Sequence, residues 1–239
     1  MTVIDPQTTL GELVTRRPAL APLLDRLGLD YCCGGQRTLD VAAQEAGIDL
    51  DPVIEELSTV GEPEAPVEWA ELGPAALVDH LEATHHAYLD DALPRLEALA
   101  AKVAGVHGER HPELAEVERL VRELKADLEP HLRKEEQVLF PMIRELSSAV
   151  APPEFHCGTL ANPISVMLAE HDRAGELLAE LRATAADYRV PEDGCASYQA
   201  LYTGLDELEA DTHLHVHKEN NLLFPAVLDA ERRLAAAPR

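Results

Sequence analysis

Apolar residues recur at helical spacing along the second part of the chain. Asn162 and Pro163 predict an N-cap followed by a proline at the first position of one helix. Short loops join the segments, so the pattern predicts an antiparallel four-helix bundle that runs up, down, up and down. From Pro74 onward the four long amphipathic segments lie at about 75–104, 112–146, 162–186 and 195–236.

The first part of the chain shows shorter helical segments separated by turn residues. Thr9 and Glu12 have the spacing of a capping box at the start of the first of them. A small helical domain is therefore expected before the bundle. Further start and stop signals place helices from Arg17 to Gly28, from Thr38 to Gly47 and from Asp51 to about Gly61.

Amino-acid composition agrees with an all-α protein and indicates a linker between its two helical regions. Aromatic residues make up 4% of the chain, β-branched runs are scarce, and alanine, leucine and glutamate are abundant. Residues 59–74 gather prolines, glycines and acids, as linkers do. The predicted organisation is a small helical domain at 1–58, a linker at 59–74 and a helical bundle at 75–239.

One sequence motif occurs twice within the bundle. The segment from His131 to Pro141 returns from His215 to Pro225, and each copy holds a histidine and a glutamate four residues apart, at Glu135 and Glu219. That spacing puts both side chains on one face of a helix. His86 and His171 precede the two copies of the motif by nearly the same number of residues, so the repeated unit is a helical hairpin.

All four of these histidines fall on apolar helical faces. A lone histidine on such a face is usually an ordinary core residue, but four imidazoles and two carboxylates buried without compensation would cost several kcal/mol. A shared cation removes that cost, and the complete set therefore favours a metal site. The expected neighbours are Leu89, Leu93 and Leu96 for His86; Leu124, Leu128 and Val138 for His131; Ile164, Met167, Leu168, Leu178 and Leu181 for His171; and Leu208 and Leu222 for His215.

Four nitrogens, two carboxylates and no thiolate suit iron or manganese better than structural zinc. Two metal ions with two terminal histidines each, bridged by Glu135 and Glu219, would use every ligand. Positions would stay open for an oxo or hydroxo bridge and for a small ligand such as dioxygen, nitric oxide or peroxide.

The other histidines fit this site less well. His85 is the alternative to His86, although the helical face and the offset favour His86. His213 and His217 point away from the His215–Glu219 face and are interpreted as outer-shell or surface residues. The last four are also not expected to be ligands, because they lie in or beside loops or off the apolar face: His107, His111, His156 and His80.

Net charge and cysteine content bear on the partners and the compartment that the protein can have. Against 44 acidic residues there are 20 basic ones, a net charge of −24, which disfavours nucleic acid and anionic membranes as partners. No apolar stretch has the length of a membrane span, and Met1–Asp5 lacks a signal-peptide pattern, so the expected compartment is the cytoplasm. In that compartment the four cysteines are expected to be thiols or redox groups rather than a structural disulfide set, and Cys157 receives no role.

Two of the cysteines, Cys32 and Cys33, are adjacent and are followed by Gly34 and Gly35. Adjacent cysteines cannot close an unstrained disulfide. Two interpretations remain: a thiol pair that takes up iron or electrons or contacts a damaged cluster, or two small buried residues in a turn. Thiols beside flexible glycines favour the first.

The bundle resembles the hemerythrin-like family in the two copies of the repeated motif and in the segments Ala169–Asp172 and Thr84–His86. The segment Leu29–Leu39 resembles the small ScdA-type N-terminal domain. Together they resemble the repair-of-iron-centres family of di-iron proteins. The resemblance implies two iron ions, oxo- or hydroxo-bridged, and the ligands His86, His131, Glu135, His171, His215 and Glu219.

The same resemblance implies a role for the protein. It would repair iron–sulfur clusters damaged by oxidative or nitrosative stress, with damaged iron–sulfur proteins as partners and Cys32 and Cys33 as the transfer pair. It is compatible with a homodimer, and it matches His107 to a loop histidine of the family. Two alternatives stay open: a di-iron reductase of nitric oxide or nitrite, and an oxygen or nitric oxide sensor.

Overall fold

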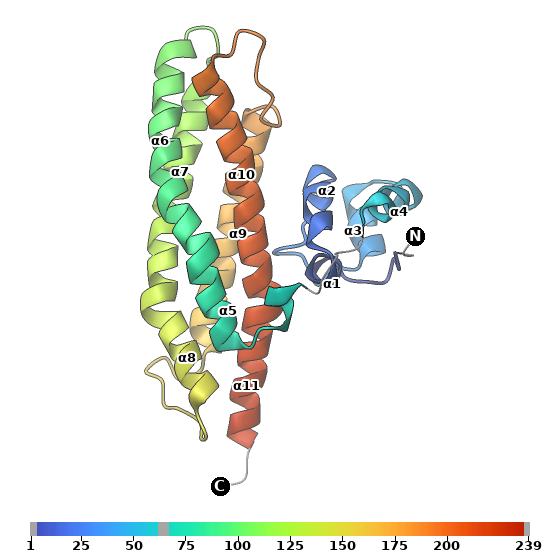
Figure 1. Cartoon of the computed structure of the whole chain (residues 1–239), viewed down its shortest axis with the longest axis vertical. Coiled ribbons are helices and arrows are strands. Elements are labelled where there is room, and N and C mark those ends of the chain that lie inside the picture. The colour runs from blue at the N-terminus through green and yellow to red at the C-terminus, as the bar shows by residue number, and fades with distance from the viewer. Residues whose placement is uncertain (1–3, 62–66, 237–239) are drawn as a thin grey trace. The chain divides into compact units, whose positions relative to one another are not determined.

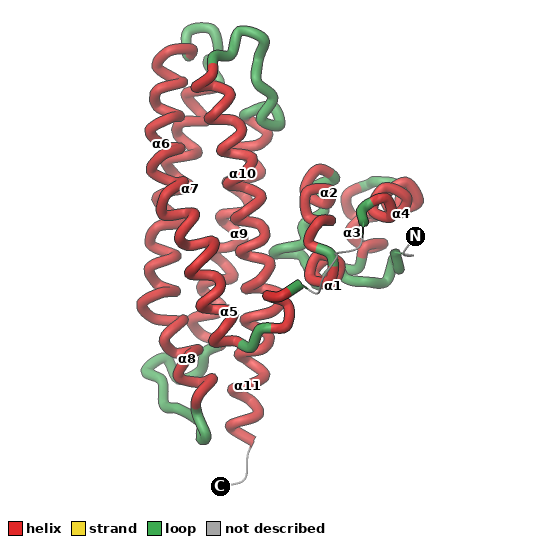
Figure 2. Tube along the Cα trace, in the orientation of Figure 1, coloured by secondary structure: helices red, strands yellow, loops and turns green. Residues whose placement is uncertain are grey.

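The computed structural model describes residues 4–61 and 67–236, and every regular element within them is a helix (Figures 1 and 2). The all-α prediction is therefore confirmed. Part of the predicted linker, at 62–66, and the first three residues lie outside the described residues. The chain divides into two compact units, one made of Met1–His80, Ile143–His156 and His213–Arg239, the other of Leu81–Met142 and Cys157–Thr212.

Short helices open the first unit, as the turn signals predicted. Thr9 caps the first through a hydrogen bond from the N–H of Glu12 to its side chain, and Gly47, at φ 69°, ends the third in the left-handed region. Asp49 caps the fourth, which begins at Leu50, one residue before the predicted start at Asp51. The four helices are α1 (Leu10–Arg16), α2 (Ala21–Arg26) after a 3₁₀ turn at Pro18–Leu20, α3 (Leu39–Ala46) and α4 (Leu50–Thr59).

Within residues 67–236 the structure describes seven α-helices. They are α5 (Pro74–Leu81), α6 (Ala87–His107), α7 (Leu114–Lys134), α8 (Phe140–Ser148), α9 (Ala161–Thr184), α10 (Ala196–Lys218) and α11 (Phe224–Ala236). In the second unit, α6, α7, α9 and α10 run side by side and share one apolar core (Figure 1). Short loops at 108–113 and 185–195 connect neighbouring helices at one end. The sequence-predicted four-helix bundle is present.

Gly204 shows how closely two of these helices approach. A Cβ built on Gly204 of α10 would lie 2.6 Å from Leu96 Cδ2 of α6. A larger residue there would require the Leu96 side chain to move.

In the described part of the chain, three π-helical turns interrupt the long helices at Glu82–His86, Glu135–Leu139 and Glu219–Leu223. In the second and third, the N–H of the phenylalanine that follows bonds to the carbonyl of the glutamate five residues earlier. Pro141 and Pro225 follow one residue later and lack the N–H that an α-helix would bond to the carbonyl four residues back. The proline therefore helps to explain why the helix widens at this point of each repeat.

The π turns change which residues face the core. Val138 was expected beside His131 but is 40% exposed, whereas Leu139 is 1% exposed. Leu223 likewise takes the buried place expected for Leu222. One extra residue in the turn shifts the inward face by one position, which α-helical spacing could not foresee.

Two smaller expectations about α9 were also wrong. The helix begins at Ala161, after Leu160, so Asn162 is not its cap. Instead the Asn162 side chain donates to the carbonyl of Cys157 at 2.8 Å. Leu168 lies at the edge of the apolar face, 38% exposed, while Ile164, Met167, Leu178 and Leu181 are buried.

The first unit has its own apolar core. Side chains of α1–α4 pack together with Val216, so the end of α10 belongs to this core. Among the described residues, no helix has both the length and the apolar character that crossing a bilayer requires.

Candidate metal centre

The six predicted ligands are among the most buried polar residues in the protein. Glu135 and Glu219 are 0% exposed, His171 is 1% exposed, and His86, His131 and His215 are 2–3% exposed. Burying two carboxylates to this degree is costly unless a positive charge lies beside them.

Four of the six belong to the second unit and converge there. His86 Nε2 and His131 Nε2 each lie 3.5 Å from Glu135 Oε2. His171 Nε2 lies 3.1 Å from His131 Nε2. In the first unit, His215 Nε2 lies 3.4 Å from Glu219 Oε1. The Nε2 atoms of three histidines therefore face a carboxylate, and the fourth faces another imidazole nitrogen.

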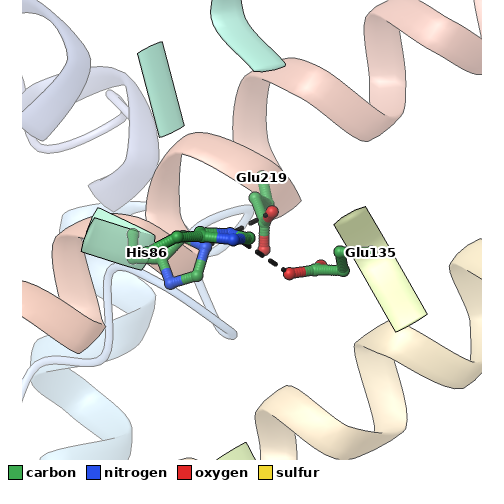
Figure 3. Close-up of side chains that lie close together, drawn as sticks. His86, Glu135 and Glu219 are labelled. Atoms are coloured by element: carbon green, nitrogen blue, oxygen red, sulfur yellow. Dashed lines mark ion pairs between the residues drawn. The ribbon is translucent and has the colours of Figure 1, made fainter. Parts of the chain in front are cut away.

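These residues form two groups whose ligand atoms lie close enough together to hold a metal ion. One group is His86, Glu135, His215 and Glu219, the other is His131, Glu135, His171 and Glu219, and the ligand atoms of each group all lie within 4.8 Å of one another. Figure 3 shows the imidazole of His86 directed at the carboxylates of Glu135 and Glu219. Glu135 and Glu219 belong to both groups.

Two carboxylates outside the ligand groups, those of Glu136 and Glu170, orient the rings of His86 and His131. His86 Nδ1 donates to Glu136 Oε1 at 2.8 Å, and His131 Nδ1 donates to Glu170 Oε2 at 2.9 Å. Burial works to raise the pKa of Glu170, but hydrogen bonds from Lys134 and His131 outweigh it, so the pKa is lowered and the group is ionised. A neutral histidine whose Nδ1 donates in this way presents an unprotonated Nε2.

The donor set fits a metal ion for this reason. With Nδ1 turned toward Glu136 or Glu170, the Nε2 atoms of His86 and His131 are both directed at the carboxylate of Glu135. Imidazole nitrogens and carboxylate oxygens that converge in this way are ligands that a metal ion can bind together. The pairing of a ligand histidine with an outer carboxylate is also the usual support of protein metal sites.

Sequence reasoning missed these outer carboxylates, although their positions gave a signal. Glu136 directly follows Glu135, and Glu170 directly precedes His171. A residue next to a ligand on a helix points to the side, where it can reach a histidine of the neighbouring helix.

Replacing Glu170 by alanine should weaken metal binding by about 10–100-fold, because His131 loses the group that orients its ring. Metal titration against a chelator of known affinity measures this change. Exposed Glu176 on the same helix provides a matched control, Glu176→Ala, which should bind metal as the unmodified protein does. Equal affinities for both variants would contradict the orienting role.

The remaining histidines lie elsewhere. His85 is buried, but its Nδ1 lies 2.8 Å from Asp211 Oδ1, and it belongs to neither group. His80 Nε2 accepts from Lys218 at 2.9 Å. His156 is exposed, and His111 lies 2.9 Å from Asp193. His107, expected in or beside a loop, is the last residue of α6 and precedes the loop.

His213 and His217 contact the N-terminal helices, which the sequence did not reveal. His213 Nδ1 lies 2.9 Å from Asp25 Oδ1. His217 is 0% exposed, so the surface interpretation was wrong for it. Its Nδ1 donates to the carbonyl of Tyr31 at 3.3 Å, and burial lowers its pKa to about 4, which keeps the ring neutral.

The paired cysteines lie beside that contact. The Sγ atoms of Cys32 and Cys33 are 3.9 Å apart, and Asp30 Oδ1 lies 3.3 Å from the Cys32 sulfur. The hydrogen bond with Cys33 and burial raise the pKa of the Cys32 thiol well above its ordinary value. Asn221, in the π turn that begins with Glu219, donates to the carbonyl of Cys32 at 3.0 Å. Asp30, Cys32 and Cys33 form a further group that could hold a metal ion.

Comparison with known proteins agrees with this geometry. Residues 77–227 match the Hemerythrin HHE cation binding domain, and residues 6–61 match the ScdA N-terminal domain, a domain of unknown function. A protein of Enterobacter sp. (strain 638) named iron-sulfur cluster repair protein YtfE is 36% identical over 93% of this chain and 97% of its own length. Proteins of the same name from Escherichia coli O81 (strain ED1a) and Escherichia fergusonii are 35% identical over the same shares.

The matched cation-binding domain contains every residue of the two His/Glu groups, and the similarity to the YtfE proteins extends over nearly the whole chain. The chain therefore belongs to the hemerythrin HHE family of metal-binding helical bundles, in the branch that carries an ScdA-type N-terminal domain.

Proposed function

We propose that the protein is a di-iron protein that repairs iron–sulfur clusters damaged by oxidative or nitrosative stress, and that it does so by supplying iron. The observation that carries the proposal is that Glu135 and Glu219 belong to both groups of candidate ligands. Two metal ions sharing two carboxylates use all six side chains, whereas one ion would use only one of the two groups.

The donor set supports iron as the metal. Two imidazoles and two shared carboxylates for each ion lack the thiolates of structural zinc sites and the all-oxygen shell that magnesium and calcium prefer. Bound iron would supply a redox-active centre with positions open to a small ligand. Glu136 and Glu170 would keep the rings of His86 and His131 directed at it.

Donation of iron fits both the composition of the site and the relatives. Each ion would have only two terminal protein ligands, and bridging ligands are shared, so the protein holds each ion with few bonds. The relatives that match nearly the whole chain are named iron-sulfur cluster repair proteins. Damaged iron–sulfur proteins would then be the partners, and iron would be the cargo.

The proposal is tested by mixing the iron-loaded protein with a dehydratase whose cluster has lost iron. Recovery of dehydratase activity should exceed the recovery given by the same amount of free ferrous iron. Iron should leave the protein as activity returns, which metal analysis after separation shows. Recovery no greater than with free iron contradicts the proposal. Continuous consumption of nitric oxide without loss of iron would instead support a reductase.

Replacing both Cys32 and Cys33 by alanine should separate iron storage from transfer. Neither thiol belongs to the His/Glu groups, so iron loading should stay unchanged. Recovery of the dehydratase should fall to the level of free iron if the thiols pass iron on. Cys157→Ala is the matched control and should keep full recovery. Loss of iron from the double variant would contradict the proposed division of roles.

A further inference from the structure

A second reactive group lies at the end of the bundle where α6 and α10 meet their loops. Cys195 directly precedes α10, and His107 is the last residue of α6. The Nε2 atom of His107 lies 3.2 Å from the Cys195 sulfur. His107 is 4% exposed, whereas Cys195 is exposed. A solvent-accessible thiol is thus held against a buried imidazole.

Arg110 determines which nitrogen of His107 carries the proton. Its guanidinium lies 3.2 Å from His107 Nδ1. A guanidinium can only donate hydrogen bonds, so Nδ1 must accept and Nε2 must carry the hydrogen. His107 therefore donates to the sulfur of Cys195. A hydrogen bond to sulfur favours the thiolate over the thiol.

The start of α10 acts in the same direction. The hydrogen bond from His107, followed by the backbone N–H of Tyr198, lowers the pKa of Cys195 to about 7. The ring of Tyr198 also packs edge-on against His107, with centroids 5.4 Å apart, which limits rotation of the imidazole.

The acidic groups nearby are themselves paired with positive or donating groups. Asp193 lies 3.2 Å from Arg110 and 2.9 Å from His111, and the hydrogen bond from His111 is the main reason that its pKa is lowered. Glu113 lies 3.2 Å from His111. Because Asp193 interacts directly with a guanidinium, its charge opposes the thiolate less than a free carboxylate would.

Cys195 differs in this respect from the other cysteines. Cys32 is buried and its pKa is raised, and Cys33 is half-buried beside it. Cys157 is half-buried, and its sulfur lies 3.9 Å from the sulfur of Met142. Among the four cysteines, Cys195 alone combines exposure with a hydrogen bond from a buried imidazole.

We propose that Cys195 and His107 form a thiol-modification site that reacts with small disulfides. The Cys195 thiolate attacks one sulfur of the disulfide, a new S–S bond forms to Cys195, and the original S–S bond breaks. The other half leaves as a thiolate, so one disulfide is consumed for each one formed and no further oxidant is needed. This site is independent of the metal centre and of the proposed repair function.

Dithiodipyridine is a suitable probe for the complete, iron-loaded protein, since each reaction releases a thiopyridone that absorbs light. One thiol per chain should react in a fast phase. Recorded from about pH 5 to about pH 9, which brackets the ordinary cysteine pKa of about 8.5, the fast rate should have its midpoint near pH 7. Mass spectrometry of the modified protein should locate the adduct at Cys195.

Three variants identify the reacting group. Cys195→Ser should remove the fast phase, while Cys157→Ser should keep it. In His107→Leu the thiol pKa should return toward about 8.5, and the rate at pH 7 should fall about threefold to fivefold, since the less abundant thiolate is the stronger nucleophile.

Two results would overturn the proposal. One is a fast phase that survives in Cys195→Ser, which would assign the reactive thiol to another cysteine. The other is a midpoint above about pH 8 in the unmodified protein, where the ordinary thiol value lies. The second measurement needs no variant, so it stands even if His107→Leu folds poorly.

Discussion

Glu135→Gln should remove metal from both groups of ligands. Glu135 belongs to each group, and the glutamine side chain is neutral and cannot bridge two cations through both of its terminal atoms. Loss of the outer partner of a ligand already costs about 10–100-fold in affinity, so loss of a bridging carboxylate should cost more than about 100-fold. Metal analysis after anaerobic loading with ferrous iron and desalting should find less than one ion per chain.

A second variant, His171→Ala, distinguishes the loss of one ion from the loss of both. His171 belongs to only one group, together with His131, Glu135 and Glu219. This variant should therefore keep the ion held by His86 and His215 and lose the other. The expected order of iron content is the unmodified protein first, His171→Ala second and Glu135→Gln last.

Glu145→Gln is the matched control for the charge change. Glu145 is exposed on α8, close in sequence to Glu135 but outside both groups. Its iron content should equal that of the unmodified protein. Full loading of Glu135→Gln would contradict the bridging role, and equal loss of iron from Glu135→Gln and His171→Ala would contradict two distinct ions.

Removal of the metal should destabilise the protein by several kcal/mol. Glu135 and Glu219 are 0% exposed, and their oxygens lie within 4.8 Å of each other in each group. Without the ion, the two carboxylates keep only histidine neighbours at 3.4–3.5 Å, and taking one charged partner out of a buried pair costs about 3–5 kcal/mol. Because 1 kcal/mol corresponds to about 2–4 °C in a chain of this size, a chelator should lower the melting temperature by about 10 °C.

The double variant Glu135→Gln/Glu219→Gln should show the opposite behaviour. Without metal it should melt at a higher temperature than the metal-free unmodified protein, because two neutral amides replace two carboxylates that repel each other. Chelators and added iron should not shift its melting temperature. The site would thus reduce the stability of the metal-free fold in exchange for metal binding.

Circular dichroism melts with and without chelator measure both effects. Glu145→Gln/Glu207→Gln, at two exposed positions, is the control for removing two negative charges and should follow the unmodified protein. Two outcomes contradict the electrostatic account: a melting temperature of the unmodified protein that ignores the chelator, and a metal-free double variant less stable than the unmodified protein.

Local spacing explains why the candidate ligands could be found in the sequence. The relation between His131 and Glu135, or between His215 and Glu219, depends only on the rise and turn of one helix. Periodic burial along a helix placed His86 and His171 on the inner face in the same way, and the structure brings all six together. Helix positions followed from the same signals, within a few residues at their ends.

Features that depend on packing between distant segments could not be found in this way. His107 and Cys195 are 88 residues apart, and His217 and Tyr31 are 186 residues apart, so no local pattern links either pair. The π turns could not be predicted either, because their extra residue leaves no periodic signal in the sequence. The prediction that Val138 faces the core was therefore wrong.

The sequence by itself determined the helical class, the repeated hairpin and the side chains able to hold metal, since all three depend on spacing along single helices. Tertiary structure alone decided that Glu136 and Glu170 direct the rings of His86 and His131, and that His107 contacts the sulfur of Cys195. Those contacts depend on which helix faces align and on where each helix widens, and both are set by the packing of the whole core.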